Sequence, residues 1–520
     1  MKKQNKSYYP EKEAFLRSTE DINMLTVYRK FLADTETPIN AFQKIGRGAS
    51  YSYLLESAEG KDKLARYSFL GLNPFLIFQS KGNQVEINYQ EKKENYLENP
   101  FLPLRRLLAS FQTIKVDGLP RFWGGGVGYL GYDLVRFIED LSNNITNDLA
   151  LPDCMLVYAG TMIVFDHLTH QLWIIANVPL DKDNRTREQA YEQATEQIEK
   201  IISQLNNSAS KGGEVKEEVA VEEKELETDL EKIESSINKS DSNMTKEEFV
   251  EKVIKAKEYI LAGEAFQIVL SQRLNRKTSE NPFKIYRLLR SLNPSPYMYY
   301  LNYGETQIVG ASPEPLVRLT GKLVESKPVA GTRPRGENYQ EDLRLEKDLL
   351  SDEKEKAEHT MLVDLARNDL GRVCRPGTVK VSQFMQVERF SQVMHLVSEV
   401  QGIIQTDKNA LDALIACFPA GTVSGAPKVR AMEIIDELEP HCRGPYAGAI
   451  GYLGFNGNMD TCITIRTIVF KGREAYIQAG AGIVSDSVPE KEYTETLNKA
   501  QALLKAIELA EEFPDDFSLR

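Results

Sequence analysis

The stretch SDEKEKAEHTMLVDLARND, residues 351–369, has apolar residues at the spacing of an α-helix. Leu362 and Leu365 follow Glu358 at the fourth and seventh positions, so Glu358 extends the apolar face of the predicted helix. Glu355 lies one turn earlier on that face. Two carboxylates that point into a protein interior each need a cation or a proton, because an unpaired buried charge is costly. The alternative is a solvent-exposed first turn, where acidic residues are favoured.

A second helix, predicted over 491–513, repeats this arrangement. Glu492, Glu495 and Lys499 share the face that later carries Leu503. An ordinary ion pair between Glu495 and Lys499 would explain why two of these charged residues share a face. However, the helix follows QAGAGIVSDSVPE, a strand that leads into a glycine-rich loop where backbone amides can approach a small anion. Four carboxylates without a neighbouring His or Cys suit Mg²⁺, which in turn indicates a carboxylate or phosphate substrate.

Composition restricts the class of protein. The chain has 520 residues, 64 of them basic and 76 acidic, for a net charge of −12. This is typical of a globular enzyme with more than one structural unit, and it argues against a nucleic-acid partner. No apolar run reaches the roughly 20 residues of a membrane helix. The basic residues of MKKQNKSYYPEKEAF precede no apolar run, and the five cysteines form no CxxC pair, so we expect a cytoplasmic protein.

Sequence character divides the chain into three regions: 1–200, 201–244 and 245–515. The first region has short strand-like runs, among them 161–167 and 171–178, and ends in an amphipathic helix over 186–205. The second is acidic and lacks aromatic residues and proline, so we interpret it as a linker or surface segment, helical over 217–233. The third alternates helices with strands. Its expected strands are 307–320, 461–470 and 474–486.

The segment GVGYLGYD at 126–133 is similar to AIGYLGFN at 449–456, through either duplicated geometry or chance. Gly126, Gly128 and Gly131 have the spacing of a dinucleotide-binding loop. However, no hydrophobic strand precedes them and no acid follows at the required distance. We therefore expect these glycines to pack against a neighbouring backbone.

Eight motifs occur in an order that resembles the chorismate-binding enzymes. They are GASPEPLVR, PVAGTRPRG, AEHTMLVDLARNDLGRV, VMHLVSEV, FPAGTVSGAPKVRAMEII, GPYAGAIGY, TCITIRT and QAGAGIVSDS. With LLES and RYSFLG near the start, the chain resembles in particular component I, the large subunit, of anthranilate synthases. The resemblance covers all but the acidic region and the extreme N-terminus. It implies a mixed α/β fold in which large β-sheets pack as a sandwich with helices outside.

Two positions distinguish the reactions of this family. Aminodeoxychorismate synthases commonly have a lysine nucleophile before Gly-Thr, where this chain has Ala330. Isochorismate and salicylate synthases use a lysine base at the position that resembles Gln267, and glutamine hydrogen-bonds an amine but takes no proton. The resemblance thus implies conversion of chorismate and ammonia to anthranilate and pyruvate, the first step of L-tryptophan biosynthesis. An aminodeoxychorismate synthase component I and a tryptophan-binding regulatory subunit with an inactive site are the alternatives.

The resemblance also implies a role for individual residues. The catalytic residues would be Glu314 as general acid, His395 in pyruvate elimination, Gln267 and Thr422. The chorismate-binding residues would be Gly331, Thr332, Tyr446, Arg466, Gly480, Ala481, Gly482 and Lys499. The cofactor would be Mg²⁺, held directly by Glu358 and Glu495 and through water by Glu355 and Glu492. Without the resemblance, Glu314 is also compatible with a strand-end carboxylate and His395 with a core histidine.

Regulation and partnership are implied in the same way. Ser57 in LLES, and Pro296, Tyr297 and Met298 in NPSPYM, resemble the tryptophan feedback site of the family, although these prolines also suit an ordinary turn. The first region would then be the regulatory, tryptophan-binding part, and 245–515 the catalytic domain. The sequence contains no recognisable glutaminase motif. Glutamine-dependent activity would therefore need a separate amidotransferase subunit, component II, in a heterotetramer of two large and two small subunits.

Overall fold

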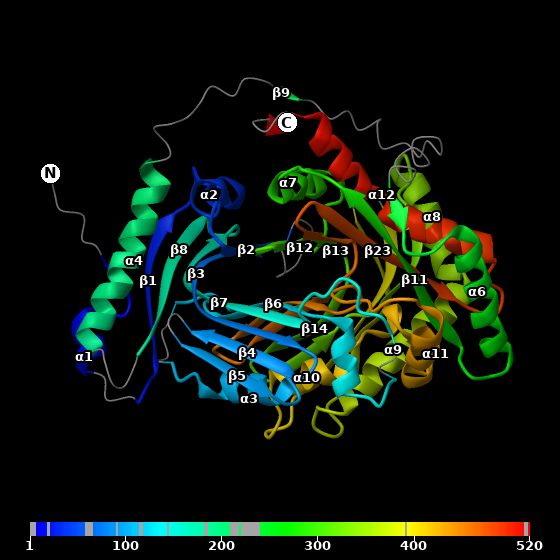
Figure 1. The fold of residues 1–520 in the computed structure, drawn as a ribbon, viewed down its shortest axis with the longest axis horizontal. Helices are drawn as coiled ribbons and strands as arrows, with labels where there is room; N and C mark the ends of the chain where they lie inside the picture. The colour runs from blue at the N-terminus through cyan, green and yellow to red at the C-terminus, as the bar shows by residue number, and fades with distance from the viewer. Residues whose placement is uncertain are drawn as a thin grey trace.

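The computed structural model describes residues 7–17, 21–57, 66–89, 92–113, 118–142, 145–180, 186–207, 218–219, 240–390, 393–513 and 518–519. Its strands are joined by antiparallel pairing into a network that folds into two stacked layers, with helices on the outer faces (Figure 1). This confirms the predicted mixed α/β sandwich.

The first layer is built from ten main strands. They are β1 (Met24–Leu32), β2 (Tyr51–Glu56), β3 (Tyr67–Lys81), β7 (Cys154–Asp166), β8 (Gln171–Pro179), β11 (Gln267–Lys277), β12 (Tyr297–Tyr303), β13 (Thr306–Ser312), β22 (Thr467–Lys471) and β23 (Glu474–Ile483). Their order across the layer is β11–β23–β22–β13–β12–β2–β3–β7–β8–β1. The short strands β10 (Asp241–Ser242) and β19 (Gly425–Ala426) also pair with β11.

The second layer contains β4 (Gln84–Tyr89), β5 (Lys93–Leu97), β6 (Gly125–Leu130), β14 (Pro315–Thr320), β15 (Leu323–Ser326), β16 (Val329–Pro334), β17 (Lys380–Arg389), β18 (Val393–Ile403), β20 (Ala449–Gly454) and β21 (Met459–Ile463). Starting from β5, the order is β5–β4–β3–β7–β6–β20–β21–β14–β15–β18. Strands β16 and β17 both pair with β18.

The long strands β3 and β7 belong to both layers and join them. Their pairing register shifts between Pro74 and Leu76, and Asn73 has a positive φ of 51°. Gly160 lies opposite this bend, where an added Cβ would come within 2.7 Å of the Asn73 carbonyl oxygen. A bulge with a close backbone approach is a common way for a strand to pass between two packed sheets.

Two expected strands are each interrupted where the chain passes from one layer to the other. The run 307–320 is β13 in the first layer and β14 in the second, separated by Pro313 and Glu314. The run 461–470 is β21 in the second layer and β22 in the first, separated by residues 464–466. The prediction of continuous strands was therefore wrong here. Proline supplies no N–H for a ladder, which explains the first interruption, and Arg466 has a positive φ of 51° at the second.

The helices are α1 (Lys12–Arg17), α2 (Pro38–Ile45), α3 (Phe101–Ser110), α4 (Arg187–Asn207), α6 (Lys246–Leu261), α7 (Pro282–Leu292), α8 (Tyr339–Ser351), α9 (Glu353–Gly371), α10 (Ala410–Cys417), α11 (Lys428–Leu438) and α12 (Pro489–Glu512). The helices predicted over 186–205, 351–369 and 491–513 correspond to α4, α9 and α12. Good N-terminal caps begin α6 and α9: Thr245 forms a capping box for α6, and the Asp352 carboxylate accepts two backbone N–H groups of α9.

Three apolar cores follow from this layering. One lies between the two layers and includes Tyr53, Val127 and Tyr299. A second packs α2, α4, α7 and α12 onto the outer face of the first layer. A third packs α3 and α10 onto the outer face of the second layer, and Figure 1 shows the helices on these opposite sides.

The two similar glycine-rich segments are neighbours: β6 pairs with β20 from Ala449 opposite Leu130 to Gly454 opposite Gly125. An added Cβ at Gly131 would meet the Gly444 carbonyl oxygen at 2.8 Å, and one at Gly128 would overlap the Met155 carbonyl. The expectation that these glycines pack against a neighbouring backbone is therefore confirmed for Gly128 and Gly131, whereas an added Cβ at Gly126 would meet the Tyr158 side chain at 2.8 Å.

The boundaries of the three regions remain a prediction. Strands of the first and third regions pair directly, β2 with β12 and β6 with β20, and α4 continues to Asn207. Most of the acidic region lies outside the described residues. Of the predicted helix over 217–233 only Glu218–Val219 are described, and they form a two-residue strand, β9, parallel to β24 (Ser518–Leu519). Within the described part of the chain, no helix is long and apolar enough to cross a membrane.

Candidate active site

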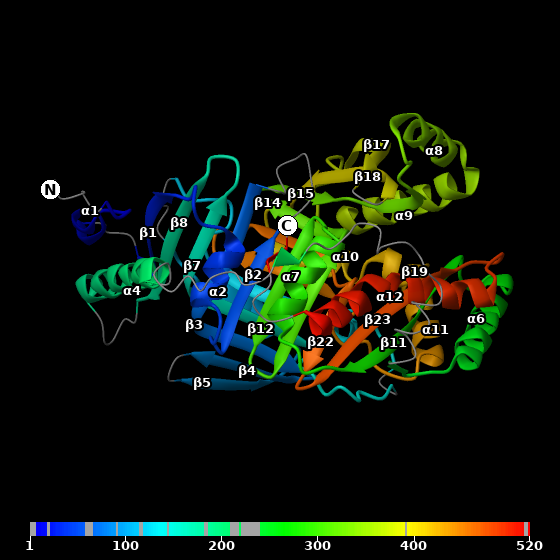
Figure 2. The same ribbon diagram turned by 90° about the horizontal axis from the view of Figure 1, so that it is seen from above.

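A cavity of about 630 Å³ lies between α9, β16 and β18 on one side and β11, β23 and α12 on the other. Seen from above, α8, α9, β17 and β18 form one side of this end of the molecule, and β11, β23 and α12 the other (Figure 2). The cavity brings together predicted catalytic, chorismate-binding and metal-binding residues, which come from distant parts of the chain. Those that line it are Gln267, Glu314, Gly331, Thr332, Glu355, Glu358, His395, Thr422, Tyr446, Arg466, Gly480, Gly482, Glu492, Glu495 and Lys499.

Ala481 is the one predicted active-site residue that does not line the cavity. It alternates with Gly480 and Gly482 along β23, so its methyl group points to the opposite face. There it joins the apolar cluster that contains Phe249 and Ile434.

Glu314 lies where the chain crosses from β13 in the first layer to β14 in the second layer. We call this segment, 313–314, the first crossing, and the segment 464–466 between β21 and β22 the second crossing. Burial raises the pKa of Glu314 to about 7, against the opposing effects of the Thr422 hydroxyl and the Lys499 ammonium group. A substantial fraction of the carboxyl therefore keeps its proton near neutral pH, as a general acid requires.

Gln267 begins β11 and reaches across to α9. Its Nε2 donates to Glu358 Oε1 at 3.1 Å, which leaves the amide oxygen as an acceptor. The side chain passes over Gly482, where an added Cβ would lie 2.8 Å from Gln267 Nε2. A side chain at position 482 would therefore displace the amide group of Gln267.

His395 is held by the segment that contains the β-bulge of β16. Its Nδ1 lies 2.9 Å from the Gly331 carbonyl oxygen and 3.1 Å from Thr332 Oγ1. Because a carbonyl can only accept, Nδ1 carries the proton and Nε2 is left unprotonated. Burial lowers the pKa of His395, the bond to Gly331 opposes this effect, and the Arg466 cation adds to it. The imidazole is thus neutral at pH 7 and can act as a base.

Arg466 lies at the second crossing, in the left-handed conformation noted above. Its Nη1 donates to the Lys499 carbonyl oxygen at 2.7 Å. Burial lowers the pKa of Arg466, and the Tyr446 side chain acts against this. Tyr446 approaches the strand opposite, because an added Cβ at Gly480 would lie 2.8 Å from its hydroxyl. The left-handed backbone conformation of Arg466 is strained for a residue other than glycine, and such strain is typical of functional sites.

The four predicted metal-binding carboxylates form two pairs, one at the start of α9 and one at the start of α12. Burial raises the pKa of Glu355, with a contribution from the neighbouring Glu358. Burial likewise raises the pKa of Glu492; its bond to Ser487 opposes this and the charge of Glu495 adds to it. The contributions of Glu358 and Glu495 indicate crowding of negative charge that a cation would relieve.

Present contacts hold these carboxylates apart. Lys499 Nζ lies 2.7 Å from Glu495 Oε1 and donates to the Gly480 carbonyl oxygen at 2.8 Å. Among the described residues, no three His, Cys, Asp or Glu side chains already converge as a metal-binding group. The donor set nonetheless fits Mg²⁺, because it consists of carboxylate oxygens and a divalent ion in such sites also takes water and substrate oxygens.

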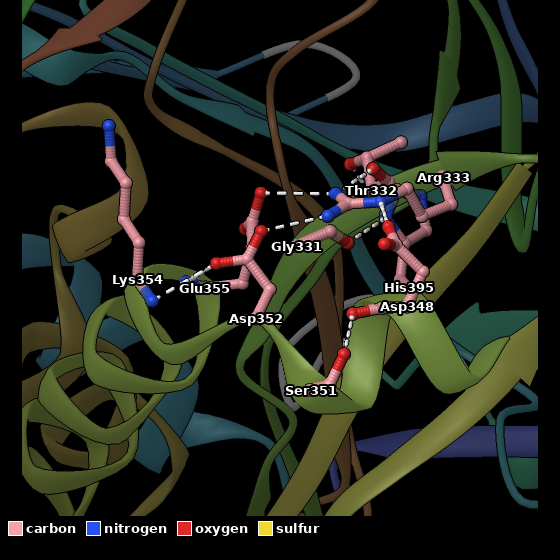
Figure 3. Close-up of polar contacts among 9 residues, drawn as sticks. All are labelled: Gly331, Thr332, Arg333, Asp348, Ser351, Asp352, Lys354, Glu355 and His395. Atoms are coloured by element: carbon pink, nitrogen blue, oxygen red, sulfur yellow. Dashed lines mark hydrogen bonds and ion pairs between the residues drawn. The ribbon is translucent and has the colours of Figure 1, made fainter. Parts of the chain in front are cut away.

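Sequence reasoning missed Arg333, which directly follows Thr332. Its guanidinium binds Asp348, Asp352 and Glu355, as Figure 3 shows. The motif GTRPRG signals a pair of arginines, but the partners of Arg333 lie 15 or more residues further along the chain, where no periodicity connects them to it.

A second pocket, of about 50 Å³, lies between the two layers and collects the four residues predicted for the feedback site. It is lined by Ser57, Pro296, Tyr297 and Met298, and also by Glu56, Arg121 and Asp460, which were not predicted. Tyr286 donates to the buried Glu56 carboxylate at 2.6 Å, and Arg121 lies 3.2 Å from Asp460. The pocket thus combines aromatic walls with two acidic side chains and one basic side chain.

Comparison with known proteins assigns the family. The family model for chorismate binding enzymes matches residues 51–505. Anthranilate synthase component 1 of Acetivibrio thermocellus is 50% identical over 514 residues, covering 97% of this chain and 99% of the relative. The same component from Aquifex aeolicus is 46% identical, covering 97% and 99%. The crystal structure of anthranilate synthase component I from Streptococcus pneumoniae TIGR4 superimposes with a TM-score of 0.72 at 35% identity, covering 91% of this chain and 99% of that one.

The chain therefore belongs to the chorismate-binding enzymes. Within them it belongs to the anthranilate synthase component 1 family, since the similarity to these enzymes extends over nearly the whole length. The resemblance stated from the motifs is thus confirmed.

Gly331→Ala tests whether close packing at the bulge shapes the site. Gly331 has a φ of 64°, and an added Cβ would lie 3.1 Å from Glu355 Oε2 and 3.0 Å from Leu349 Cδ1. Gly321→Ala is the matched control, because Gly321 has a φ of 61° with no atom within 4 Å. Backbone strain of about 1–2 kcal/mol is expected in both variants by denaturant unfolding. Only Gly331→Ala should also lose turnover of chorismate, and equal turnover in the two variants would contradict this description of the site.

Proposed function

We propose that this chain converts chorismate and ammonia to anthranilate and pyruvate in the 630 Å³ cavity. The observation that supports this most strongly is the convergence in one cavity of a carboxyl with a pKa of about 7, a neutral imidazole and an arginine, with four further carboxylates at two helix starts. Chorismate is a dicarboxylate that must lose a hydroxyl group and then a pyruvate unit, and these groups match those needs.

The two carboxylates of chorismate would bind to different sides of the cavity. Arg466 offers a guanidinium to the enolpyruvyl carboxylate, and the Tyr446 hydroxyl donates beside it. Burial raises the pKa of Tyr446 to about 12, so this hydroxyl keeps its proton. The ring carboxylate would face Lys499 and the backbone of 480–482. Mg²⁺ held by Glu358 and Glu495, and through water by Glu355 and Glu492, would supply a positive charge that neutralises and orients that carboxylate.

Amination needs an acid and an oriented ammonia. Glu314 would protonate the hydroxyl at ring carbon 4, which leaves as water, and Thr422 beside it would orient its carboxyl. The nitrogen lone pair forms the new bond at ring carbon 2 as both ring double bonds shift, and the ammonium group that results then loses a proton to solvent. Because Gln267 Nε2 is engaged with Glu358, its amide oxygen is free to accept an N–H of ammonia and aim the lone pair.

Elimination needs a base. His395 Nε2 would remove the hydrogen from ring carbon 2, the bond between carbon 3 and the ether oxygen would break, and the departing enolpyruvate would take up a proton to become pyruvate. The Nδ1 bond to the Gly331 carbonyl oxygen keeps the required tautomer. The ring becomes aromatic in this step, which makes it favourable.

The alternative product is aminodeoxychorismate, which retains the pyruvate unit. The position at which a lysine nucleophile would be needed is Ala330, and this residue lines the cavity with a methyl group only. The two lysines that line the cavity, Lys354 and Lys499, form ion pairs with Asp486 and Glu495. The presence of His395 in the same cavity further favours elimination.

The second pocket would bind tryptophan as a feedback inhibitor. Its aromatic and apolar walls suit an indole, and Glu56 and Arg121 offer opposite charges to an amino acid's ammonium and carboxylate groups. The present volume of about 50 Å³ is smaller than a ligand of this size needs, so binding would move the walls apart. That requirement suits a regulatory site, because the ligand would favour one packing of the layers over another.

An amidotransferase subunit, component II, would supply the ammonia in a heterotetramer of two large and two small subunits. The relatives' designation as component 1 supports a second component. All five cysteines are free thiols, which supports a reducing compartment such as the cytoplasm.

The reaction is tested by mixing the lone chain with chorismate, Mg²⁺ and ammonium salt at mildly alkaline pH. We expect anthranilate fluorescence together with an equal amount of pyruvate, and no turnover when glutamine replaces ammonium. An aminated product that retains the pyruvate unit would support the alternative. Absence of product would overturn the proposal for the lone chain.

Glu314→Gln should lower kcat by about 10²–10⁴-fold, the usual contribution of a general acid. In the wild type, kcat/KM for chorismate should fall as pH rises through about 7, because Glu314 loses its proton there. This limb should be absent from the residual activity of the variant. The profile is measured at constant free ammonia, and an unchanged limb in Glu314→Gln would assign the titration to another group.

Ser57→Leu should weaken inhibition by tryptophan, because the added isobutyl group fills part of a pocket that is already small. Since Ser57 is remote from the cavity lining, kcat with ammonia should stay close to that of the wild type. The concentration of tryptophan for half inhibition is compared in the two proteins. Equal inhibition would exclude this pocket as the feedback site.

A further inference from the structure

Arg333 connects β16 to the beginning of α9 through three carboxylates (Figure 3). Its Nε donates to Asp348 Oδ2 at 2.7 Å, on α8, and its Nη2 to Asp352 Oδ2 at 2.8 Å, on the N-cap of α9. Its Nη1 is shared between the Thr332 carbonyl oxygen at 3.0 Å and Glu355 Oε1 at 3.4 Å. Each nitrogen of the guanidinium therefore has a different carboxylate.

The segment that carries Arg333 touches both halves of the active site. On one side, the Gly331 carbonyl oxygen and the Thr332 hydroxyl hold His395. On the other side, Glu355 Oε2 packs against the Cα of Gly331, and a Cβ added at Gly331 would lie 3.1 Å from this oxygen. The segment 331–333 therefore contacts both the His395 imidazole and the Glu355 carboxylate.

We propose that Arg333 is a positioning residue that anchors the first turn of α9 so that Glu355 and Glu358 face the cavity, and that it thereby sets the affinity for the divalent cation. This inference rests on the proposed magnesium site. The two short contacts go to Asp348 and Asp352, which are not among the proposed ligands, and the long contact goes to Glu355. Asp348 and Asp352 therefore anchor the guanidinium, and the longer contact leaves Glu355 able to turn toward a cation.

Only arginine can fill this role. Its planar fork presents five N–H donors in fixed directions, whereas a lysine ammonium is a point charge on a flexible stem. The side chain of Arg333 is 20% exposed, and its three partners come from α8, the helix junction and α9. An isolated surface ion pair contributes little to stability, so we expect the effect of this network on geometry to exceed its effect on folding.

Arg333→Lys tests the proposal because it keeps the charge near the cavity and removes the fork. The probe is Mn²⁺ alone, whose binding to the protein is followed by loss of the free-ion EPR signal. We expect the Kd for Mn²⁺ to rise about 10-fold, the lower end of the usual cost of losing a residue that orients a metal ligand. The Mg²⁺ concentration for half-maximal turnover should rise in parallel, by more than kcat falls.

Two further variants complete the test. Asp348→Ala removes one carboxylate that binds Arg333, at an exposed position on α8. It should also raise the Kd for Mn²⁺, but by a smaller factor than Arg333→Lys does. Arg367→Lys is the matched control, because Arg367 forms an exposed ion pair with Asp364 on α9 and should bind Mn²⁺ as the wild type does. An Arg333→Lys protein with wild-type affinity would overturn the inference and leave the cation site intact. Failure of the wild type to bind Mn²⁺ would overturn the cation site and the inference together.

Discussion

Hydrogen bonds between two chain crossings hold the acid and the arginine of the candidate active site. The crossing at 313–314 and the crossing at 464–466 run between the same two layers, side by side. Ala311 N donates to the Arg466 carbonyl oxygen at 3.0 Å, and Ile463 N donates to the Glu314 carbonyl oxygen at 3.0 Å. Ser312 Oγ adds a bond to the Ile463 carbonyl oxygen at 2.7 Å. Glu314 and Arg466 are therefore fixed by backbone contacts at the edge of two packed sheets, and neither depends on a long loop.

This rigidity matters because the cavity is electrostatically unfavourable by itself. Glu355 and Glu492 lie in the first turns of α9 and α12, where the helix dipole favours negative charge, and Glu358 and Glu495 lie about one turn further along. Even so, burial and mutual repulsion raise the pKa of Glu355 and of Glu492. Lys499 and Arg333 balance part of the charge from opposite sides. What remains is a deficit of positive charge at the place where the proposed mechanism needs a divalent cation and a dianionic substrate together.

The same crossings lead to the second pocket. Strand β21 contributes Asp460 and Cys462 to that pocket and continues directly into residues 464–466. Tyr299 also lines the pocket, and its hydroxyl lies 2.6 Å from Thr467 Oγ1. A ligand that moves the pocket walls thus acts on the backbone that carries Arg466. By reciprocity, chorismate bound to Arg466 would alter the affinity of the pocket for the proposed inhibitor by the same factor.

Helical periodicity predicts α4, α9 and α12 correctly, whereas the strand pattern does not predict the two crossings, for one physical reason. Helical periodicity shows which residues share a face, so the carboxylates of α9 and α12 were predicted to lie on the apolar face, with a solvent-exposed first turn of α9 and an ordinary Glu495–Lys499 ion pair as the alternatives. The segments 307–320 and 461–470 are rich in apolar residues on both sides of Glu314 and Arg466, because both layers bury their strands. Periodicity does not report the layer to which a strand belongs, so the interruptions at Glu314 and Arg466 were invisible.

The resemblance supplied the site residues that periodicity could not, since it transfers positions that a known fold has already brought together. It did not supply Arg333, whose meaning depends on three carboxylates far along the chain. Glu56, Arg121 and Asp460 were missed for the same reason: each is an ordinary charged residue in sequence, and only packing between the layers makes it part of a pocket. Residues that react can be inferred from motifs, whereas residues that hold them in place are defined by non-local contacts and need the structure.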